Sequence, residues 1–308
     1  MRYFTLILFL LSTTLVAQDV HYSQWTKNPV FVSPSFTGSI TDKMRITAQK
    51  REQWASVTVP FSTNSLSLDA PLGKNGLGAQ IIFDQSGSSH LSLTQLNLQY
   101  SREISEWRLG LSLGFAQRNI DYTDLVFLDP SESVVSLSKS YVDLGLGVHR
   151  EFRIDNFKEL QIGYSVFHLN SPNRSFLNQE DILSFRHHFF SVLEIEMSDQ
   201  VSLNPSLFFS NQNKQKELIL GAEISYDLNN NDQDVILFGS ANYRVADAII
   251  FAVGTKYNQT FVGLNLDLNV SDFSPATNNY GAWEISFIHT IKHSTISRPN
   301  YLACPSFL

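Results

Sequence analysis

The stretch that decides the fold is residues 107–115, which read Trp-Arg-Leu-Gly-Leu-Ser-Leu-Gly-Phe. Its apolar side chains recur at every second position, with arginine, glycine or serine between them. A period of two is typical of a β-strand with two unlike faces, because successive side chains of a strand point to opposite sides. The alternation returns over 142–149, 218–228 and 262–270, and no window shows a comparable run at helical spacing. The pattern predicts an all-β protein.

Turn signals divide the chain between Met44 and Lys292 into about fourteen such segments. We expect strands near 44–57, 61–70, 76–85, 89–103, 107–118, 139–152, 158–169, 185–197, 200–210, 216–227, 233–245, 247–257, 259–270 and 281–292. Most have ten residues or more, whereas strands of soluble sandwiches usually have about five or six. A strand tilted across a bilayer needs about 9–11 residues. Length and alternation together predict a transmembrane antiparallel β-barrel.

The two faces of these strands differ in size and polarity. The alternating Leu, Val and Phe side chains are expected to face lipid, and the Gly, Ser, Asn and Asp side chains the lumen. Arginine in place of Leu111 should therefore disturb the lipid face, whereas serine in place of Gly110 should be tolerated. A secreted soluble β-sandwich or β-propeller is the rival architecture.

Composition narrows the class of protein further. The 308 residues are 43% hydrophobic and 17% charged, so there is ample apolar surface to bury and disorder is excluded. A net charge of −7 argues against a nucleic-acid partner, which needs a basic face. The single cysteine excludes a disulfide scaffold and a cysteine-rich metal site. We expect no cofactor and no metal.

The first seventeen residues have the character of a secretory signal peptide. A positive start at Met1-Arg2 precedes an apolar run over 3–11, and small residues follow up to Ala17, the expected cleavage position. The run is too short for a membrane-spanning helix, which needs about 20 residues, and a buried N-terminal helix is the alternative. A signal peptide followed by a β-barrel predicts that the protein lies in the bacterial outer membrane, with lipids as one partner.

The connections between strands indicate which end of the barrel faces outward. With a periplasmic mature N-terminus, turns after even-numbered strands should be short and loops after odd-numbered strands long. The longest connections, 119–138, 170–184 and 271–280, all follow odd-numbered strands. Two features fit less well: Pro205 inside the ninth strand, which predicts a bulge or a break, and an abrupt turn near Ala246.

Two flanking segments lack the alternation. Residues 18–43 contain Pro29, Pro34 and several aromatics, and we expect a periplasmic strap or lumen plug, or else a leader packed on the barrel rim. A barrel of this size encloses more space than side chains alone fill, so its lumen is either water-filled or plugged. The tail 293–308 follows the barrel domain 44–292, and its prolines argue against further pairing.

No pattern of catalytic residues stands out, so an enzyme is not expected. His187 and His188 are adjacent on a strand and point to opposite faces, which prevents them from chelating one metal together. The glycines at 145 and 147 have the spacing of lumen positions rather than of a phosphate-binding loop. From the barrel alone, a porin-like solute channel with no secretion role would be the expected function.

The two ends of the mature chain carry a family resemblance. Asp19-Val20-His21-Tyr22-Ser23-Gln24-Trp25, Asn28-Pro29 and Pro34-Ser35-Phe36-Thr37-Gly38 at the start, with Cys304-Pro305-Ser306-Phe307 at the end, resemble the motifs of the PorP/SprF family of Bacteroidetes outer-membrane proteins. Four internal segments are also similar to family motifs: 51–54, 76–78, 164–169 and 283–286. Trp25, Ser33 and Trp283 depart from the family's usual residues.

The resemblance implies an accessory outer-membrane component of type IX secretion and gliding motility. Such a protein is needed for export or surface attachment of a partner adhesin, whose C-terminal sorting domain it binds, and it also contacts periplasmic ring components of the machinery. The motif residues are then candidates for partner binding: His21, Tyr22, Ser23, Gln24, Trp25, Asn28, Pro29, Pro34, Phe36, Gly38, Cys304 and Pro305. For the N-terminal aromatics the alternative is packing against the barrel interior. For Cys304 the alternatives are a buried or capped thiol and a disulfide to another subunit.

Overall fold

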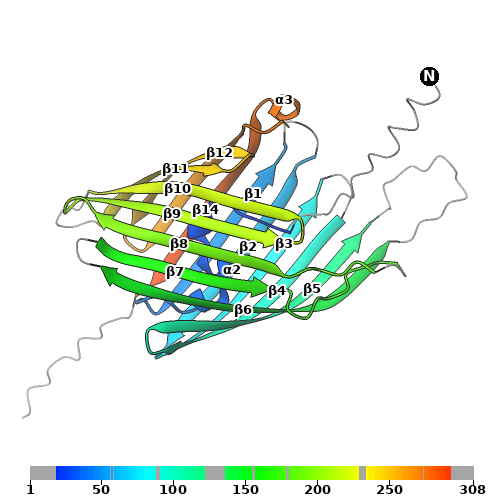
Figure 1. Cartoon of the computed structure of the whole chain (residues 1–308), viewed down its shortest axis with the longest axis horizontal. Helices are drawn as coiled ribbons and strands as arrows, with labels where there is room; N and C mark the ends of the chain where they lie inside the picture. Colours follow the sequence, from blue (N-terminus) through cyan, green and yellow to red (C-terminus); the bar gives the residue numbers. More distant parts are fainter. Residues whose placement is uncertain are drawn as a thin grey trace, which may run out of the picture.

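The computed structural model describes residues 19–292 except 56, 58, 88–90, 122–135, 155–156, 178–179, 229–233 and 273, and the side chains of 157 and 158. The expected signal peptide and the tail 293–308 lie outside the described residues. The described chain forms a closed antiparallel barrel of fourteen strands (Figure 1). No helix among these residues is long and apolar enough to cross a membrane.

Each strand pairs with its neighbours along the chain, and β1 pairs with β14 to close the barrel. The strands are β1 Met44–Gln53, β2 Phe61–Leu72, β3 Asn75–Ser86, β4 Leu91–Ile104, β5 Trp107–Ile120, β6 Leu137–Ile154, β7 Phe157–Phe167, β8 Arg186–Glu196, β9 Val201–Gln212, β10 Gln215–Asp227, β11 Val235–Arg244, β12 Ala248–Tyr257, β13 Thr260–Asn269 and β14 Tyr280–Ile291. The predicted barrel fold is confirmed, and the strand ends differ from the expected ones by a few residues.

The two faces of the wall are as the alternation predicts. Along β5 the side chains of Leu109, Leu111 and Leu113 point outward and are exposed, whereas Ser112 between them is buried. On β13, Asn265 and Asp267 are buried between exposed leucines. Exposed apolar rows around a closed barrel are the surface that a bilayer covers.

The connections distinguish the two ends of the barrel. The longest ones, residues 121–136, 168–185 and 270–279, all follow odd-numbered strands and define what we call the loop end. The turns at 105–106 and 258–259 follow even-numbered strands at the opposite end, the turn end. Since barrels of bacterial outer membranes keep short turns in the periplasm, we expect the loop end to be the extracellular side.

Pro205 disturbs the wall on one side only. β9 is continuous and pairs regularly with β10, including Pro205 with Ala222. Toward β8, the pairing skips the positions opposite Asn204 and Pro205 and then resumes in the same register. Proline has no N–H to donate to a neighbouring strand. Instead of the expected bulge or break, the structure has a local gap in the pairing of β8 with β9. At the other doubtful position, Ala246 has a positive φ of 60° in the tight turn between β11 and β12.

Candidate functional site

Residues 19–38, which we call the plug, lie inside the barrel (Figure 1). They form three short helical turns: η1 Trp25–Lys27, α2 Pro29–Val32 and η2 Pro34–Phe36. Their hydrogen-bond partners lie on strands around the whole circumference, including β1, β4, β8, β11 and β14. Of the expected placements, which were a periplasmic strap, a lumen plug and a leader packed on the rim, the structure has the lumen plug.

The plug runs from the loop end to the turn end. Its first described residue, Asp19, accepts a hydrogen bond from Gln212 and forms another with the imidazole of His168, and both partners lie at the loop end. At the turn end the Gly38 N–H donates to Asp69 at 2.7 Å, and β1 starts a few residues later. The long and short connections alternate as expected, but the described chain starts at the loop end rather than at the turn end, which it reaches through the lumen.

A buried ionic cluster holds the first half of the plug. This clasp consists of Arg51, Arg244, Asp267 and Glu284, which come from β1, β11, β13 and β14. The two arginines pair with the two carboxylates: Arg51 contacts Glu284 at 2.5 Å and Asp267 at 3.0 Å, and Arg244 contacts Asp267 at 3.0 Å. Arg244 also pairs with Glu217 and Asp247 at the edge of the clasp.

The clasp binds the plug through two backbone N–H groups and through the hydroxyl of Ser23. Glu284 accepts the N–H groups of Ser23 and Gln24 at 2.6 and 2.9 Å. The Ser23 hydroxyl donates to Asp267 at 2.7 Å and also contacts Arg51 and Arg244. Removing one partner from such a network leaves a buried charge uncompensated, which typically costs about 3–5 kcal/mol.

Glycines of the wall let the second half of the plug approach closely. A Cβ on Gly110 would lie 2.2 Å from the backbone of Pro34 and Ser35. A Cβ on Gly147 would lie 2.1 Å from the Ser33 hydroxyl. The expectation that serine is tolerated at position 110 is therefore wrong, because the lumen there is filled by backbone.

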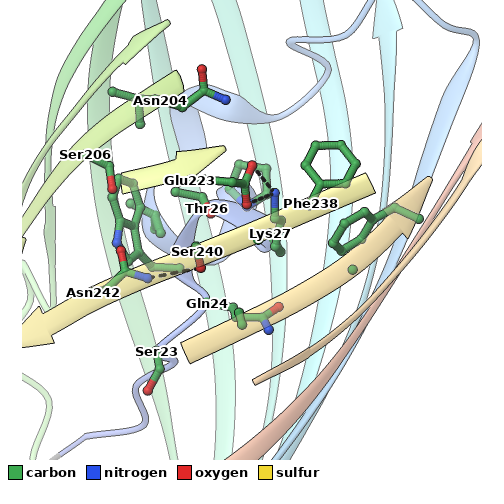
Figure 2. A pocket seen from close by; sticks show the side chains of 18 of the residues that line it. Ser23, Gln24, Thr26, Lys27, Asn204, Ser206, Glu223, Phe238, Ser240 and Asn242 are labelled. Atoms are coloured by element: carbon green, nitrogen blue, oxygen red, sulfur yellow. Dashed lines mark hydrogen bonds and ion pairs between the residues drawn. The ribbon is translucent and has the colours of Figure 1, made fainter. Parts of the chain in front are cut away.

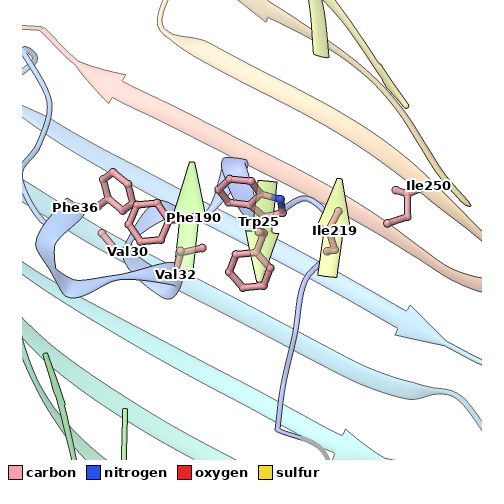
Figure 3. Packing of buried hydrophobic residues seen from close by; sticks show 8 residues of the cluster. Trp25, Val30, Val32, Phe36, Phe190, Ile219 and Ile250 are labelled. Atoms are coloured by element: carbon pink, nitrogen blue, oxygen red, sulfur yellow. The ribbon is translucent and has the colours of Figure 1, made fainter. Parts of the chain in front are cut away.

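The apolar side chains of the plug pack against the barrel interior (Figure 3). The Trp25 ring stacks on Phe208 with centroids 5.3 Å apart, and Phe36 packs on Phe190 at 5.0 Å. Ile219 and Ile250 complete the cluster from β10 and β12. The aromatic residues of the N-terminal motifs are thus part of an internal core.

At the loop end, His168 joins the start of the plug to the wall. Its Nδ1 lies 2.9 Å from Asp143, and its Nε2 lies 2.8 Å from Asp19. Burial alone lowers the pKa of His168, but the hydrogen bonds and charges of Asp143 and Asp19 outweigh burial and raise it to about 9. A protonated imidazole between two carboxylates therefore anchors Asp19.

The structure brings ten of the twelve candidate partner-binding residues together in the plug, and Cys304 and Pro305 lie outside the described residues. Tyr22, Trp25 and Phe36 are at most 6% exposed, so they are not available to a partner while the plug is seated. His21, Ser23, Gln24, Asn28, Pro29, Pro34 and Gly38 are buried or half-buried beside them.

The wall residues of the clasp were not among the candidates. Arg51 and Glu284 do lie in segments that resemble family motifs, and a charge at a lumen-facing strand position was the available signal. Asp267 carries the same signal within the alternation of β13. Nothing in the sequence marks Arg244.

A cavity of about 200 Å³ remains between the plug and the wall (Figure 2). Across it, Lys27 of the plug pairs with Glu223 of β10 at 2.7 Å and lies over the rings of Phe238 and Phe261. Within the part of the chain that the structure describes, no three His, Cys, Asp or Glu side chains gather as metal ligands do.

The sequence model of a family described as "Type IX secretion system membrane protein PorP/SprF" matches residues 15–288. Two solved structures have a similar fold. The Ralstonia pickettii toluene transporter TbuX is 10% identical, with a TM-score of 0.54 over 86% of this chain and 94% of its own. The monoaromatic hydrocarbon channel CymD is also 10% identical, with a TM-score of 0.53 over 90% and 95%. Such identities show the fold alone. No curated protein sequence matches the chain.

Proposed function

The chain belongs to the PorP/SprF family of type IX secretion system membrane proteins, and from this membership we propose that it is an accessory outer-membrane component needed for export or surface attachment of a partner adhesin. It would recognise the C-terminal sorting domain of that adhesin and contact periplasmic ring components of the machinery at its turn end. The family match over most of the chain is the observation that carries this proposal.

The seated plug supports a binding role rather than a conduit for cargo. A folded domain needs a wide passage, whereas here buried side chains of the plug and the wall fill the middle of the barrel. The motif residues Ser23 and Gln24 are occupied by the clasp. We therefore assign these residues to plug retention, and we place partner recognition at the two mouths of the barrel.

A solute channel is the second candidate. The fold is shared with a toluene transporter and a monoaromatic hydrocarbon channel, and the lumen retains a cavity beside the plug. In that case the plug would be a gate, and the protein would have no part in secretion.

Deleting the gene separates the candidates. We expect one large adhesin to disappear from the cell surface, as measured by surface labelling, while other type IX cargo is still exported. Loss of every cargo would indicate a general secretion component. Normal display of all adhesins, in a strain without a substituting paralogue, would contradict the proposal and favour the channel.

A further inference from the structure

The cavity beside the plug faces the turn end. Most of its wall side chains lie in the turn-side halves of their strands, among them Asn204 and Ser206 of β9, Phe238 of β11 and Phe261 of β13, and Asn242 of β11 borders it on the loop side. The clasp lies on the loop side of this cavity, since Arg244 is the last residue of β11. A ligand of this cavity would therefore come from the periplasm.

The route of the plug explains why this space is open. The plug leaves the lumen along β2, β4 and β5, where Gly38 bonds Asp69, and Arg108 bonds the carbonyl oxygen of Gly38. On the opposite side the wall offers small inward residues, including Ser206, Ser240 and Ala252. Beside these small residues the space between the plug and the wall is left open.

The lining matches a neutral, amide-bearing ligand. Lys27 and Glu223 already neutralise each other, so a charged ligand would have to break a pair with a 2.7 Å contact. Gln24 is 7% exposed, and its Oε1, like the buried Oδ1 of Asn204, has no hydrogen-bond partner in the described chain. Both orphan atoms are acceptors, which call for N–H or O–H donors from a ligand.

The remaining walls are apolar. Trp25 and Phe36 of the plug and Phe238 and Phe261 of the wall line the cavity beside these acceptors. Main-chain N–H groups next to an aliphatic or aromatic side chain are the features of an uncharged stretch of polypeptide. At about 200 Å³ the cavity has room for only one or two side chains.

We propose that this cavity, between the plug and strands β9–β13, is where the barrel binds an uncharged, apolar peptide segment of its secreted partner from the periplasmic side. The inference rests on the proposed function, and it identifies the recognised feature as a short segment rather than a whole folded surface. Binding between plug and wall would also make the seated plug a part of the recognition site.

Two matched serines on β9 test this placement. Ser206 lines the cavity, whereas Ser210 points into the same lumen on the loop side, where Arg186 contacts it. Each is replaced in turn by a small diazirine amino acid, the cells are illuminated, and the adducts are identified by mass spectrometry. We expect position 206 to cross-link to the adhesin's C-terminal sorting domain and position 210 to give no such adduct.

A cavity-filling variant adds a second readout. Ser240→Phe should reduce the cross-link at position 206 and adhesin display by about tenfold or more, whereas Ser240→Ala, which leaves the space open, should preserve both. Absence of the adduct at 206, in cells whose adhesin display depends on this gene, would overturn the inference and leave the proposed function standing. An adduct at 210 alone would overturn it as well, by moving entry to the loop end. Normal adhesin display in cells that lack the gene would instead refute the proposed function itself.

Discussion

Arg51 is the residue on which the position of the plug depends most directly. It compensates Glu284 and Asp267, and both carboxylates in turn accept hydrogen bonds from the plug. We expect Arg51→Met to destabilise the folded barrel by about 3–5 kcal/mol, since Glu284 would lose its arginine and Asp267 would keep only Arg244, which also pairs with Glu217 and Asp247. The measurement is the unfolding midpoint in lipid vesicles, followed by heat-modifiable mobility.

A double variant distinguishes charge balance from simple loss of packing. Arg51→Met with Glu284→Met leaves the Arg244–Asp267 pair intact, so it should be less destabilised than Arg51→Met alone. Lys50→Met, at the neighbouring half-exposed position, is the control and should be near native. If the stability lost by the double variant equals the sum of the losses of Arg51→Met and Glu284→Met alone, the clasp does not act as a balanced cluster.

His168 gives the anchor of Asp19 a defined pH dependence. Its pKa in the folded protein, about 9, is above the ordinary value near 6.5, so the anchor contributes fully below about pH 6.5 and is lost as the pH rises through 9. We expect Val20→Cys to be labelled faster by an impermeant maleimide above pH 9 than at neutral pH. Dividing this labelling rate, at each pH, by the labelling rate of a Val20→Cys, His168→Gln double variant removes the intrinsic pH dependence of the thiol. If the ratio of the two labelling rates does not change with pH, protonated His168 does not hold Asp19 in place.

At the scale of the element, strand β5 shows what alternation predicts and what it misses. The outward row was identified correctly, and Leu111→Arg should cost about 2–4 kcal/mol near the bilayer midplane. Folding yield into vesicles measures this cost, with Leu111→Ala as the control that keeps the face apolar. Equal yields for the two variants would mean that β5 does not face lipid at this position.

The inward row of β5 differs from expectation because of the plug. Gly110→Ser places a Cβ against the backbone of Pro34 and Ser35, so we expect overpacking of about 1–3 kcal/mol. Gly239→Ser on the outward row of β11, beside Ile224, controls for the glycine-to-serine change alone, since a Cβ there meets only Ile224 at 3.9 Å. The same unfolding measurement compares them, and equal stability would indicate that the plug does not contact position 110.

The strands and their faces were predictable because alternation is local and repeats along each strand. The clasp was not, because its contacts join residues as far apart as Ser23 and Glu284, 261 positions along the chain. Only barrel closure and strand register bring β1, β13 and β14 together around the plug. The chemistry of the N-terminal motif was visible in the sequence, but its role in holding the plug depends on that long-range assembly.

At the scale of the whole molecule, the barrel wall and the plug form one interlocked structure. The chain enters the lumen at the loop end, crosses it, and becomes β1 at the turn end. The two halves of the plug are held differently, by charge at the loop end and by close backbone packing beyond it. This arrangement closes the middle of the barrel and leaves the turn-side cavity open.

The ion conductance of the purified protein in planar bilayers measures whether the plug seals the barrel. The intact chain is predicted to insert without a steady open pore, because the plug fills the lumen. A variant lacking residues 19–38, whose barrel strands all remain, is predicted to show stable pore conductance. Steady conductance of the intact protein at the level of this variant would contradict a sealed, binding-only barrel and would favour a solute channel.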